Sequence, residues 1–368
     1  MHLRALTSLR FFAALMVVFH HMDFLKKSEA AELGFWYEKL FYEGTIGVTF
    51  FFILSGFILS YSYGEKLVTQ SVDYTDYMFG RVARIFPLHL LTLLAALPLS
   101  LAGAILNPTK LPSTLLALAA NATLIQAWIP SEAVYFSFNG PAWSISVEMF
   151  FYALFPLLLL LRSQTLLGLI VLVALFQHAI PWESSGFSLH FVAYVFPPSR
   201  LADFVTGILL CRLYRQRPIV SSTVATIAQA AALLLILIFL SMKESVPTAA
   251  RFDLYYLAPM SFIILTFAWA NGYLSRMISS RYLVLLGESS FALYLVHQIV
   301  IRYGEKIRIS LNLHSALTDV AAVAAYMIIS LVLSVVIHRL YENSARIRLL
   351  SALRRWRSAR ISTAEALR

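Results

Sequence analysis

The sequence predicts an all-α protein: a polytopic membrane bundle of about ten transmembrane helices, with a re-entrant or interfacial segment near residues 112–129. Of the 368 residues, 60% are hydrophobic and 13% are charged. Soluble domains are about half apolar and about a quarter charged, so this composition excludes an ordinary soluble protein. The apolar residues also gather in runs that are long enough to cross a bilayer as helices.

Ten apolar runs of spanning length follow one another along the chain. They cover residues 5–24, 46–63, 86–106, 143–161, 165–181, 199–214, 221–241, 252–271, 283–302 and 316–339. An eleventh run, at 112–129, is interrupted by Asn121, Thr123 and Gln126. Polar side chains suit a segment packed inside protein better than one that faces lipid, so we expect this run not to cross fully.

Basic residues beside the runs predict which side each loop faces, because Lys and Arg concentrate in cytoplasmic loops. The C-terminal tail is placed in the cytoplasm by its arginines, which are Arg346, Arg348, Arg354, Arg355, Arg357 and Arg360. Counting back through the runs puts Arg162 and Arg212 on the same side. If the 112–129 run does not cross, the N-terminus and the loop before residue 86 are cytoplasmic too; if it crosses, that loop faces outward. We predict a transmembrane domain at 1–345 and a basic cytoplasmic tail at 346–368.

The charge and cysteine content exclude several other classes of protein. The net charge of +10 fits arginine-rich cytoplasmic ends better than nucleic-acid binding, since no basic patch is interleaved with exposed aromatic residues. Cys211 is the one cysteine, which excludes an intramolecular disulfide. The N-terminal run lacks the small-residue cleavage site of a signal peptide, and Arg10 interrupts it. No metal site is predicted.

The first run carries two ionisable residues on one predicted helix face. Arg10 and His21 are eleven residues apart, which is three turns plus roughly 20°, with about 16 Å between them along the axis. His20 lies roughly 80° away from this line and is expected outside it. An arginine inside a span usually faces the bundle interior or a water-filled cavity. The alternative is that Arg10 extends to the cytoplasmic surface and His21 marks the outer interface.

Two further groups of charged residues are candidates for a site. Arg81 and Arg84 share a face just before a helix is expected to begin, and two guanidiniums suit a phosphate or pyrophosphate. Such pairs also serve as cytoplasmic anchors. Glu148 lies inside an apolar run, where a carboxylate is either functional or part of a buried ion pair. Arg200 and Asp203, at i and i+3, predict a local ion pair.

Small and aromatic residues in two other runs have simpler interpretations. The Ser55–Gly56 pair predicts a close contact between helices. Tyr294 and His297 lie in the run at 283–302, where a hydrogen bond between helices is the first expectation.

Together these stretches resemble the acyltransferase 3 family of integral membrane acyltransferases, from residue 6 to about residue 340. The first-helix pattern of the family is met by Arg10 and His21, and its Arg-x-x-Arg motif by Arg81 and Arg84. The segment "AWSISVEMFFYALFP" resembles the Trp-Ser-x-Ser-x-Glu motif with its downstream tyrosine and proline. The segment "SSFALYLVH" is similar to a Ser-Tyr-x-x-Tyr-x-x-His motif, with Phe291 where a tyrosine is common.

The resemblance implies transfer of an acyl group, often acetyl, from cytoplasmic acyl-CoA to a hydroxyl of a cell-envelope glycan or a related acceptor. Acetyl-CoA would be a co-substrate, with no permanently bound cofactor, and the enzyme would reside in a bacterial inner membrane. His21 is the expected base, with Arg10 and Glu148 as further catalytic residues, and Glu148 would orient the imidazole or bind the acceptor. Arg81 and Arg84 would bind the CoA phosphates. The expected substrate-binding residues are Ser146, Tyr152, Tyr294 and His297.

Two other classes of function fit part of the pattern. A proton-coupled transporter or flippase of an envelope precursor would also bury Arg, Glu and His within its helices. The chain lacks the paired repeats and matching broken helices that such carriers show. A catalytically silent scaffold would not need Arg10, His21 and Glu148 all inside spans. The expected acceptor loops, at 25–45, 130–142 and 182–198, are rich in aromatic residues, which also form interfacial belts.

Overall fold

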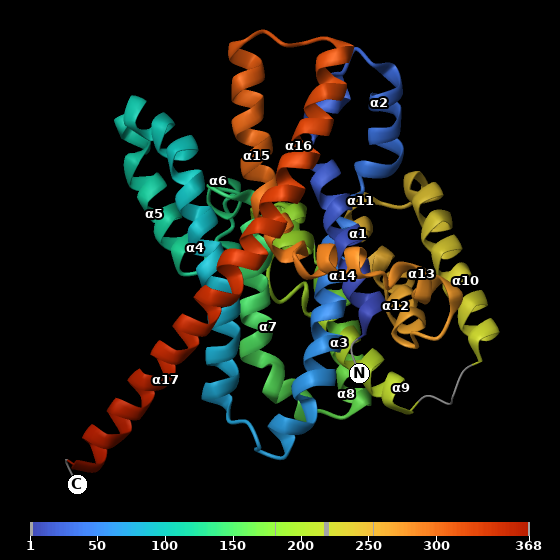
Figure 1. Cartoon of the computed structure of the whole chain (residues 1–368), viewed down its shortest axis with the longest axis vertical. Coiled ribbons are helices and arrows are strands. Elements are labelled where there is room, and N and C mark those ends of the chain that lie inside the picture. The colour runs from blue at the N-terminus through green and yellow to red at the C-terminus, as the bar shows by residue number, and fades with distance from the viewer. Residues whose placement is uncertain (1–2, 181, 217–220, 253, 367–368) are drawn as a thin grey trace.

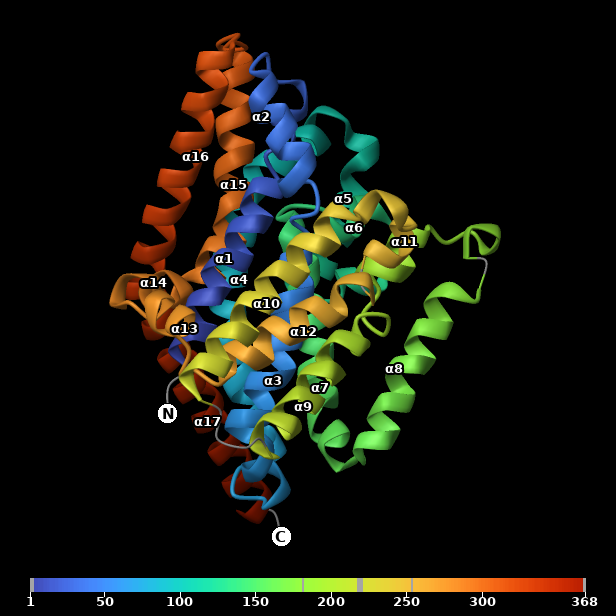
Figure 2. The same cartoon turned by 90° about the vertical axis from the view of Figure 1, so that its right-hand side faces the viewer.

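The computed structural model describes residues 3–366, except 181, 217–220 and 253. This part of the chain contains helices and turns but no strand, which confirms the predicted all-α class. The helices are α1 (Arg4–His20), α2 (Ala31–Trp36), α3 (Ile46–Val68), α4 (Tyr74–Leu106), α5 (Leu111–Ala122), α6 (Glu132–Tyr135), α7 (Trp143–Leu160), α8 (Ser163–His178), α9 (Leu201–Gln216), α10 (Ser222–Ser241), α11 (Thr248–Arg251), α12 (Leu254–Ala268), α13 (Tyr273–Ile278), α14 (Arg281–Glu288), α15 (Ser290–Ser310), α16 (Ala316–Ile337) and α17 (Asn343–Ala366). Figures 1 and 2 show α1 and α3 near the middle of the bundle, with α15 and α16 forming a hairpin that extends beyond it.

The number of spanning helices differs from the prediction. Each of the ten predicted runs contains a helix, but only five helical segments among the described residues are long and apolar enough to cross a membrane. The number is six if α14 and α15, which meet at an angle of 63°, form one broken span. The prediction of about ten spans is therefore wrong by this criterion. The physical reason is length: α8, α12, α1 and α9 have 16, 15, 17 and 16 residues.

The segment near 112–129 does not cross the bundle, as predicted. Its helix α5 has 12 residues, well short of the ~20 that a span needs. It packs against α4, and the chain then turns at Leu124, whose φ is 58°. Two of the three polar residues that suggested this behaviour are buried and bonded within the protein: Asn121 Nδ2 donates to Ser137 Oγ at 2.8 Å, and Gln126 Nε2 donates to the Ala142 carbonyl at 2.9 Å. The third, Thr123, is exposed.

The helix α4 begins earlier than expected. It starts at Tyr74 rather than near residue 86, so Arg81 and Arg84 lie within the helix and not before it. The sequence prediction was wrong here because the polar stretch at 74–85 has no apolar run of its own. In the structure this stretch becomes helical where α4 packs beside α17.

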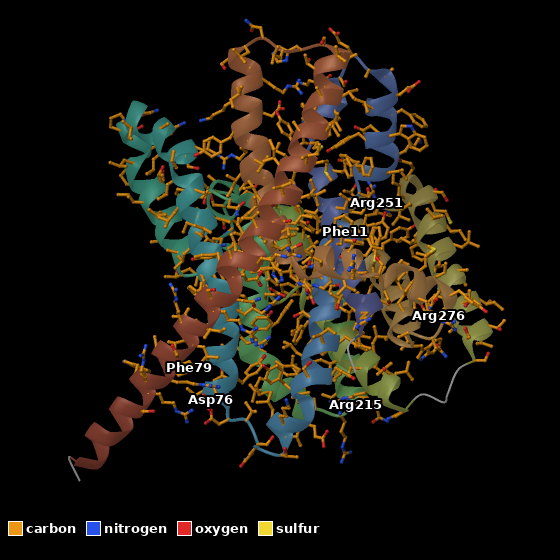
Figure 3. The ribbon with its side chains drawn as sticks, in the orientation of Figure 1. Phe11, Asp76, Phe79, Arg215, Arg251 and Arg276 are labelled. Atoms are coloured by element: carbon orange, nitrogen blue, oxygen red, sulfur yellow. The ribbon has the colours of Figure 1, made fainter. Side chains whose placement is uncertain are left out.

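The loop that joins α3 to α4 lies at the same end of the molecule as the C-terminal helix. Arg357 Nη2 donates to Asp73 Oδ2 at 2.8 Å, and Arg357 Nη1 lies 3.4 Å from Asp76 Oδ2. Figure 3 shows Asp76 beside α17, and Arg215 at the same lower end. This arrangement agrees with the predicted topology in which 112–129 does not cross. The side of the membrane that this end faces stays a prediction.

Close contact between α3 and α9 holds the middle of the bundle together, as Gly56 predicted. A Cβ added at Gly56 would lie 2.0 Å from the Phe204 carbonyl oxygen, and one at Gly207 would lie 2.0 Å from the Ile53 oxygen. Two glycines therefore allow the backbones of the two helices to meet.

We expect Gly56→Ala to destabilise the protein by about 1–3 kcal/mol, because the added methyl group must push the two helices apart. Thermal unfolding in detergent measures this effect. Gly168→Ala is the matched control, since nothing lies within 4 Å of a Cβ at that helical position, and alanine there should stabilise by about 0.5–1 kcal/mol. Equal melting temperatures for the two variants would contradict the close contact.

Candidate active site

A cavity of about 680 Å³ lies between α1, α3, α4, α7 and α15 and contains most of the predicted site residues. The predicted residues on its wall are Arg10, Arg81, Arg84, Glu148, Tyr152 and Tyr294. Lys66 and Arg346 also line it, although neither was predicted to belong to a site. Cationic side chains therefore dominate the charge of this wall, with Glu148 as the acidic group facing them.

Arg81 is held at the cavity wall by aromatic side chains. It is 8% exposed, its Nη2 donates to the Tyr63 hydroxyl at 3.0 Å, and its guanidinium lies 4.9 Å from the centre of the Tyr63 ring. The rings of Tyr77 and Tyr152 lie within 5.9 Å and 5.8 Å. Because aromatic faces attract a cation without neutralising it, Arg81 keeps its full charge available to an anion in the cavity.

Arg84 is held by a carboxylate instead. Its Nη1 lies 3.5 Å from Glu342 Oε1, and Glu342 also contacts His338 Nδ1 at 2.9 Å. Glu342 follows α16, so the end of that helix reaches the same cavity as α4. The prediction that Arg81 and Arg84 share a face is confirmed by their common cavity.

Glu148 and Arg10 belong to the larger cavity and not to the surroundings of His21. The Glu148 carboxylate lies near the hydroxyls of Tyr152 and Ser55 and near the guanidiniums of Arg10 and Arg84. The sequence left open whether Glu148 orients the imidazole of His21. In the structure, the ring of His21 contacts the Val17 carbonyl and His297 instead of Glu148.

A second cavity, of about 280 Å³, lies at the other end of the same helices and contains His21. Its wall also includes His20, Asp23, Phe136, His190, Tyr194 and Gln298. The prediction that His20 lies outside the site is wrong, because both histidines line this cavity. Helix α1 ends at His20, so the regular angle between neighbouring residues no longer separates them. The position of His21 on this wall favours a place inside the protein over a role that only marks the membrane interface.

The ring of His21 is oriented by a backbone carbonyl and by His297. His297 Nδ1 lies 3.0 Å from the Leu293 carbonyl oxygen, and a carbonyl only accepts, so this nitrogen donates. The other nitrogen of a neutral His297, Nε2, is then an acceptor, and it lies 3.2 Å from His21 Nδ1. His21 Nδ1 also lies 2.8 Å from the Val17 carbonyl. It therefore carries the proton, which leaves the lone pair of His21 on Nε2.

The two cavities meet at two residues, Val48 and Tyr294, which line both. The Tyr294 hydroxyl donates to Ser144 Oγ at 2.8 Å and also lies 3.3 Å from the Pro141 carbonyl oxygen. Ser144 Oγ also donates to Pro141 at 2.9 Å. These bonds fix the phenol ring at the junction. Arg10 and His21 thus share a helix face, as predicted, but face different cavities on either side of this junction.

Two of the predicted substrate-binding residues line neither cavity. Ser146 is 1% exposed and donates to the Leu124 carbonyl at 2.6 Å, so its hydroxyl holds the turn after α5. His297 is fully buried behind His21 and contacts that ring. The predicted ion pair of Arg200 and Asp203 is confirmed at 2.6 Å, and it is fully buried between helices.

Several residues that complete the two cavities were not predicted from the sequence. They are Lys66 and Arg346 in the larger one, and His20, His190 and Gln298 in the smaller one. Lys66 and Arg346 lie among basic residues that look alike in sequence, so only the packing of α17 against α4 distinguishes Arg346. For the smaller cavity, the sequence did offer one signal: His20 is adjacent to His21, and both histidines line this cavity.

Comparison with known proteins identifies the family. A model of the acyltransferase 3 family, described as an acyltransferase domain, matches residues 3–339. The chain belongs to the acyltransferase 3 family. This membership confirms the resemblance predicted from the motifs, and it makes the chain an acyltransferase. With its long apolar helices, this member of the family is a multi-pass membrane protein.

Two relatives show how far the similarity to this acyltransferase extends. The chain is 33% identical over 331 residues to the acyltransferase MdmB of Streptomyces mycarofaciens, covering 83% of this chain and 80% of that protein. It is 23% identical over 324 residues to the O-acetyltransferase OatA of Staphylococcus aureus (strain NCTC 8325 / PS 47), covering 82% of this chain and 51% of OatA. The chain thus spans about half the length of OatA. No solved structure matches the chain.

Proposed function

We propose that this enzyme is an O-acyltransferase that moves an acyl group, normally acetyl, from cytoplasmic acyl-CoA to a hydroxyl of a cell-envelope glycan or a related acceptor. The observation that supports this proposal is the pair of cavities that meet at Val48 and Tyr294. One cavity is lined by cations and the other contains a histidine with an available lone pair. The name of the relative OatA supports the transfer to oxygen. An acyltransferase domain over nearly the whole chain leaves the transporter or flippase without a supporting observation.

The larger cavity suits the donor. Arg81 and Arg84 would bind the CoA phosphates, since guanidiniums match phosphate oxygens in charge and in geometry. The flexible pantetheine arm would pass Arg10 and bring the thioester to the junction at Tyr294. Arg346 on the cavity wall belongs to α17, and α17 packs along α4, which carries Arg81 and Arg84. The C-terminal end of α17 is the predicted cytoplasmic end of the molecule. Both termini would then face the cytoplasm of a bacterial cell, with the protein in its inner membrane.

The chemistry follows from the lone pair on His21. Its Nε2 would take the proton of the acceptor hydroxyl while the hydroxyl oxygen attacks the carbonyl carbon of the thioester. The tetrahedral intermediate would then collapse, breaking the C–S bond, and the leaving thiolate would take the proton back from His21. The products are an ester and free CoA. Arg10, which faces the larger cavity, is placed to attract negative charge that develops near the thioester.

The smaller cavity suits an acceptor with both polar and flat apolar surfaces. Phe136, His190 and Tyr194 supply aromatic faces, and Asp23 and Gln298 supply polar groups. A pyranose ring has this mixture of hydroxyls and C–H faces, and it can stack on aromatic side chains. This composition supports a sugar hydroxyl as acceptor and places no restriction on what the sugar is attached to.

His297 is better explained as a positioning residue than as a substrate-binding one, because it contacts His21 and no cavity. We expect His297→Ala to lower kcat by about tenfold to a hundredfold with little change in KM, since the base would lose one of its orienting partners. Steady-state kinetics measure this change. His297→Gln should recover part of the activity because its amide oxygen can accept from His21 Nδ1. A large rise in KM with unchanged kcat would contradict this role.

Binding of the donor is the first test of the proposed function. Calorimetry of the detergent-purified protein with acetyl-CoA and with free CoA should show saturable binding of both. Inverted and right-side-out vesicles that contain the enzyme should then differ, with externally added acetyl-CoA used only by the inverted ones. A folded, monodisperse sample that binds neither nucleotide would exclude acyl-CoA as the donor.

A further inference from the structure

The C-terminal helix contributes a cation to the donor cavity. The family match ends at residue 339, and α17 follows from Asn343 to Ala366. Arg346, in the first turn of α17, lines the larger cavity together with Arg81 and Arg84. We propose that Arg346 is a third phosphate ligand of the donor, so that α17 completes a polyphosphate site that the family domain begins. This inference rests on the proposed function.

The charges at this end of the cavity are not balanced within the protein. Lys66, Arg81, Arg84 and Arg346 all line it. Two carboxylates of the described residues face this group: Glu342, at 3.5 Å from Arg84, and Glu148, which lines the cavity near Arg84 and Arg10. The four cations and Arg10 therefore outnumber them. The buried Nε of Arg81 has no hydrogen-bond partner within the described residues. Like charges held together attract an anion, and several phosphate groups can be bound at once by several guanidiniums.

The position of Arg346 is set by contacts on both sides of it along the chain. Before it, the Tyr341 hydroxyl donates to the Pro87 carbonyl of α4 at 3.1 Å. After it, Arg357 donates to both oxygens of Asp73, at 3.2 Å and 2.8 Å. The guanidinium of Arg357 lowers the pKa of Asp73, which keeps this bidentate contact ionised at neutral pH. Helix α17 is thereby held along α4, whose Arg81 and Arg84 face the same cavity (Figure 1).

The chemistry of the site favours a nucleotide with separated phosphates over a single phosphate. CoA carries a diphosphate and a separate 3′-phosphate on its ribose, which gives the three arginines distinct groups to bind. An anionic lipid headgroup offers the same phosphate chemistry at a membrane surface. The arginines face a cavity that leads to Glu148 and Tyr294 inside the bundle, which is the path that the thioester must take and a lipid headgroup need not.

The test is CoA affinity of the full chain in nanodiscs of zwitterionic lipid, measured by calorimetry for the wild type and three variants. Arg346→Gln should weaken CoA binding by about tenfold to a hundredfold, the value of one charge-assisted hydrogen bond to an ionised partner. Arg346→Lys should retain part of the affinity. Arg348→Gln is the matched control, since that residue is exposed on the same helix and does not line the cavity. Melting temperatures establish that the variants are folded.

The outcomes separate this inference from the proposed function. A wild type that does not bind CoA would overturn the acyl-CoA donor itself. A wild type that binds CoA, with an Arg346→Gln variant of equal affinity, would overturn only the role of Arg346. Repeating the titration in nanodiscs with anionic lipid adds a further arm. An effect of Arg346→Gln that occurs only with anionic lipid would assign Arg346 to a headgroup and overturn the inference.

Discussion

Replacing His21 with alanine should lower the rate of acyl transfer by about a hundredfold to ten-thousandfold while leaving acetyl-CoA binding unchanged. His21 is the ring whose Nε2 lone pair is left available by the bonds of Nδ1 to Val17 and His297. General-base catalysis contributes about a hundredfold to ten-thousandfold to such reactions, so the loss should fall in that range. The donor cavity does not include His21, and its wall should be unaffected by the substitution.

The measurement is acyl transfer from labelled acetyl-CoA to membrane acceptors, together with calorimetric binding of CoA. His178→Ala is the control, because that histidine makes the same bond to the carbonyl four residues earlier, at 3.1 Å, but lies exposed on α8. We expect the control to transfer normally. Turnover by His21→Ala at the wild-type rate would remove this residue from the reaction.

The double variant Arg81→Ala with Arg84→Ala should weaken donor binding by roughly a hundredfold or more. Each guanidinium would lose a charge-assisted contact of about 1.5–3 kcal/mol, and every ~1.4 kcal/mol is a factor of ten in affinity. At saturating donor, kcat should change less than KM, since both residues bind the part of the donor that does not react.

The control for the Arg81 and Arg84 double variant should also remove two positive charges, from residues at the same end of the molecule that do not line the cavity. Arg348→Ala with Arg355→Ala does so, because both side chains are exposed on α17 and neither lines the cavity. Calorimetry with CoA compares the two double variants at one ionic strength, so that long-range electrostatic effects are equal. Equal weakening by both would indicate a general effect of charge and not a site.

The sequence predicted the positions of the helices well and their number as spans poorly. Each predicted apolar run contains a helix, because burial and helix formation select the same residues. Helix α17, which packs against α4, was predicted only as a basic tail. Apolar periodicity could not predict that α4 continues outward to Tyr74, since those residues become helical through contact with α17. It also treated α8 and α12 as full spans, although helix ends depend on local turns that hydropathy does not report.

For the site, the sequence predicted which residues gather but not how they divide. The pattern of Arg10 and His21 on one face, with Arg81, Arg84 and Glu148, corresponds to residues that line cavities in the structure. The division into two cavities depends on Tyr294, whose hydrogen bonds to Ser144 and Pro141 connect distant parts of the chain. Contacts of this kind, including that of His297 with His21, have no signature in local sequence.

The junction at Val48 and Tyr294, where the two cavities meet, bears on how well the membrane around the enzyme holds back protons. In the proposed orientation, the two cavities approach this junction from opposite faces of the membrane, so little protein would separate two compartments at different electrical potential. A continuous file of water through that point would conduct protons and dissipate the gradient that the cell maintains. The phenol ring, hydrogen-bonded to Ser144 and Pro141, would block such a file at rest, and a thioester that enters the junction would block it in place of the ring. Acyl transfer and the barrier to proton leakage would then depend on the same two residues, Val48 and Tyr294.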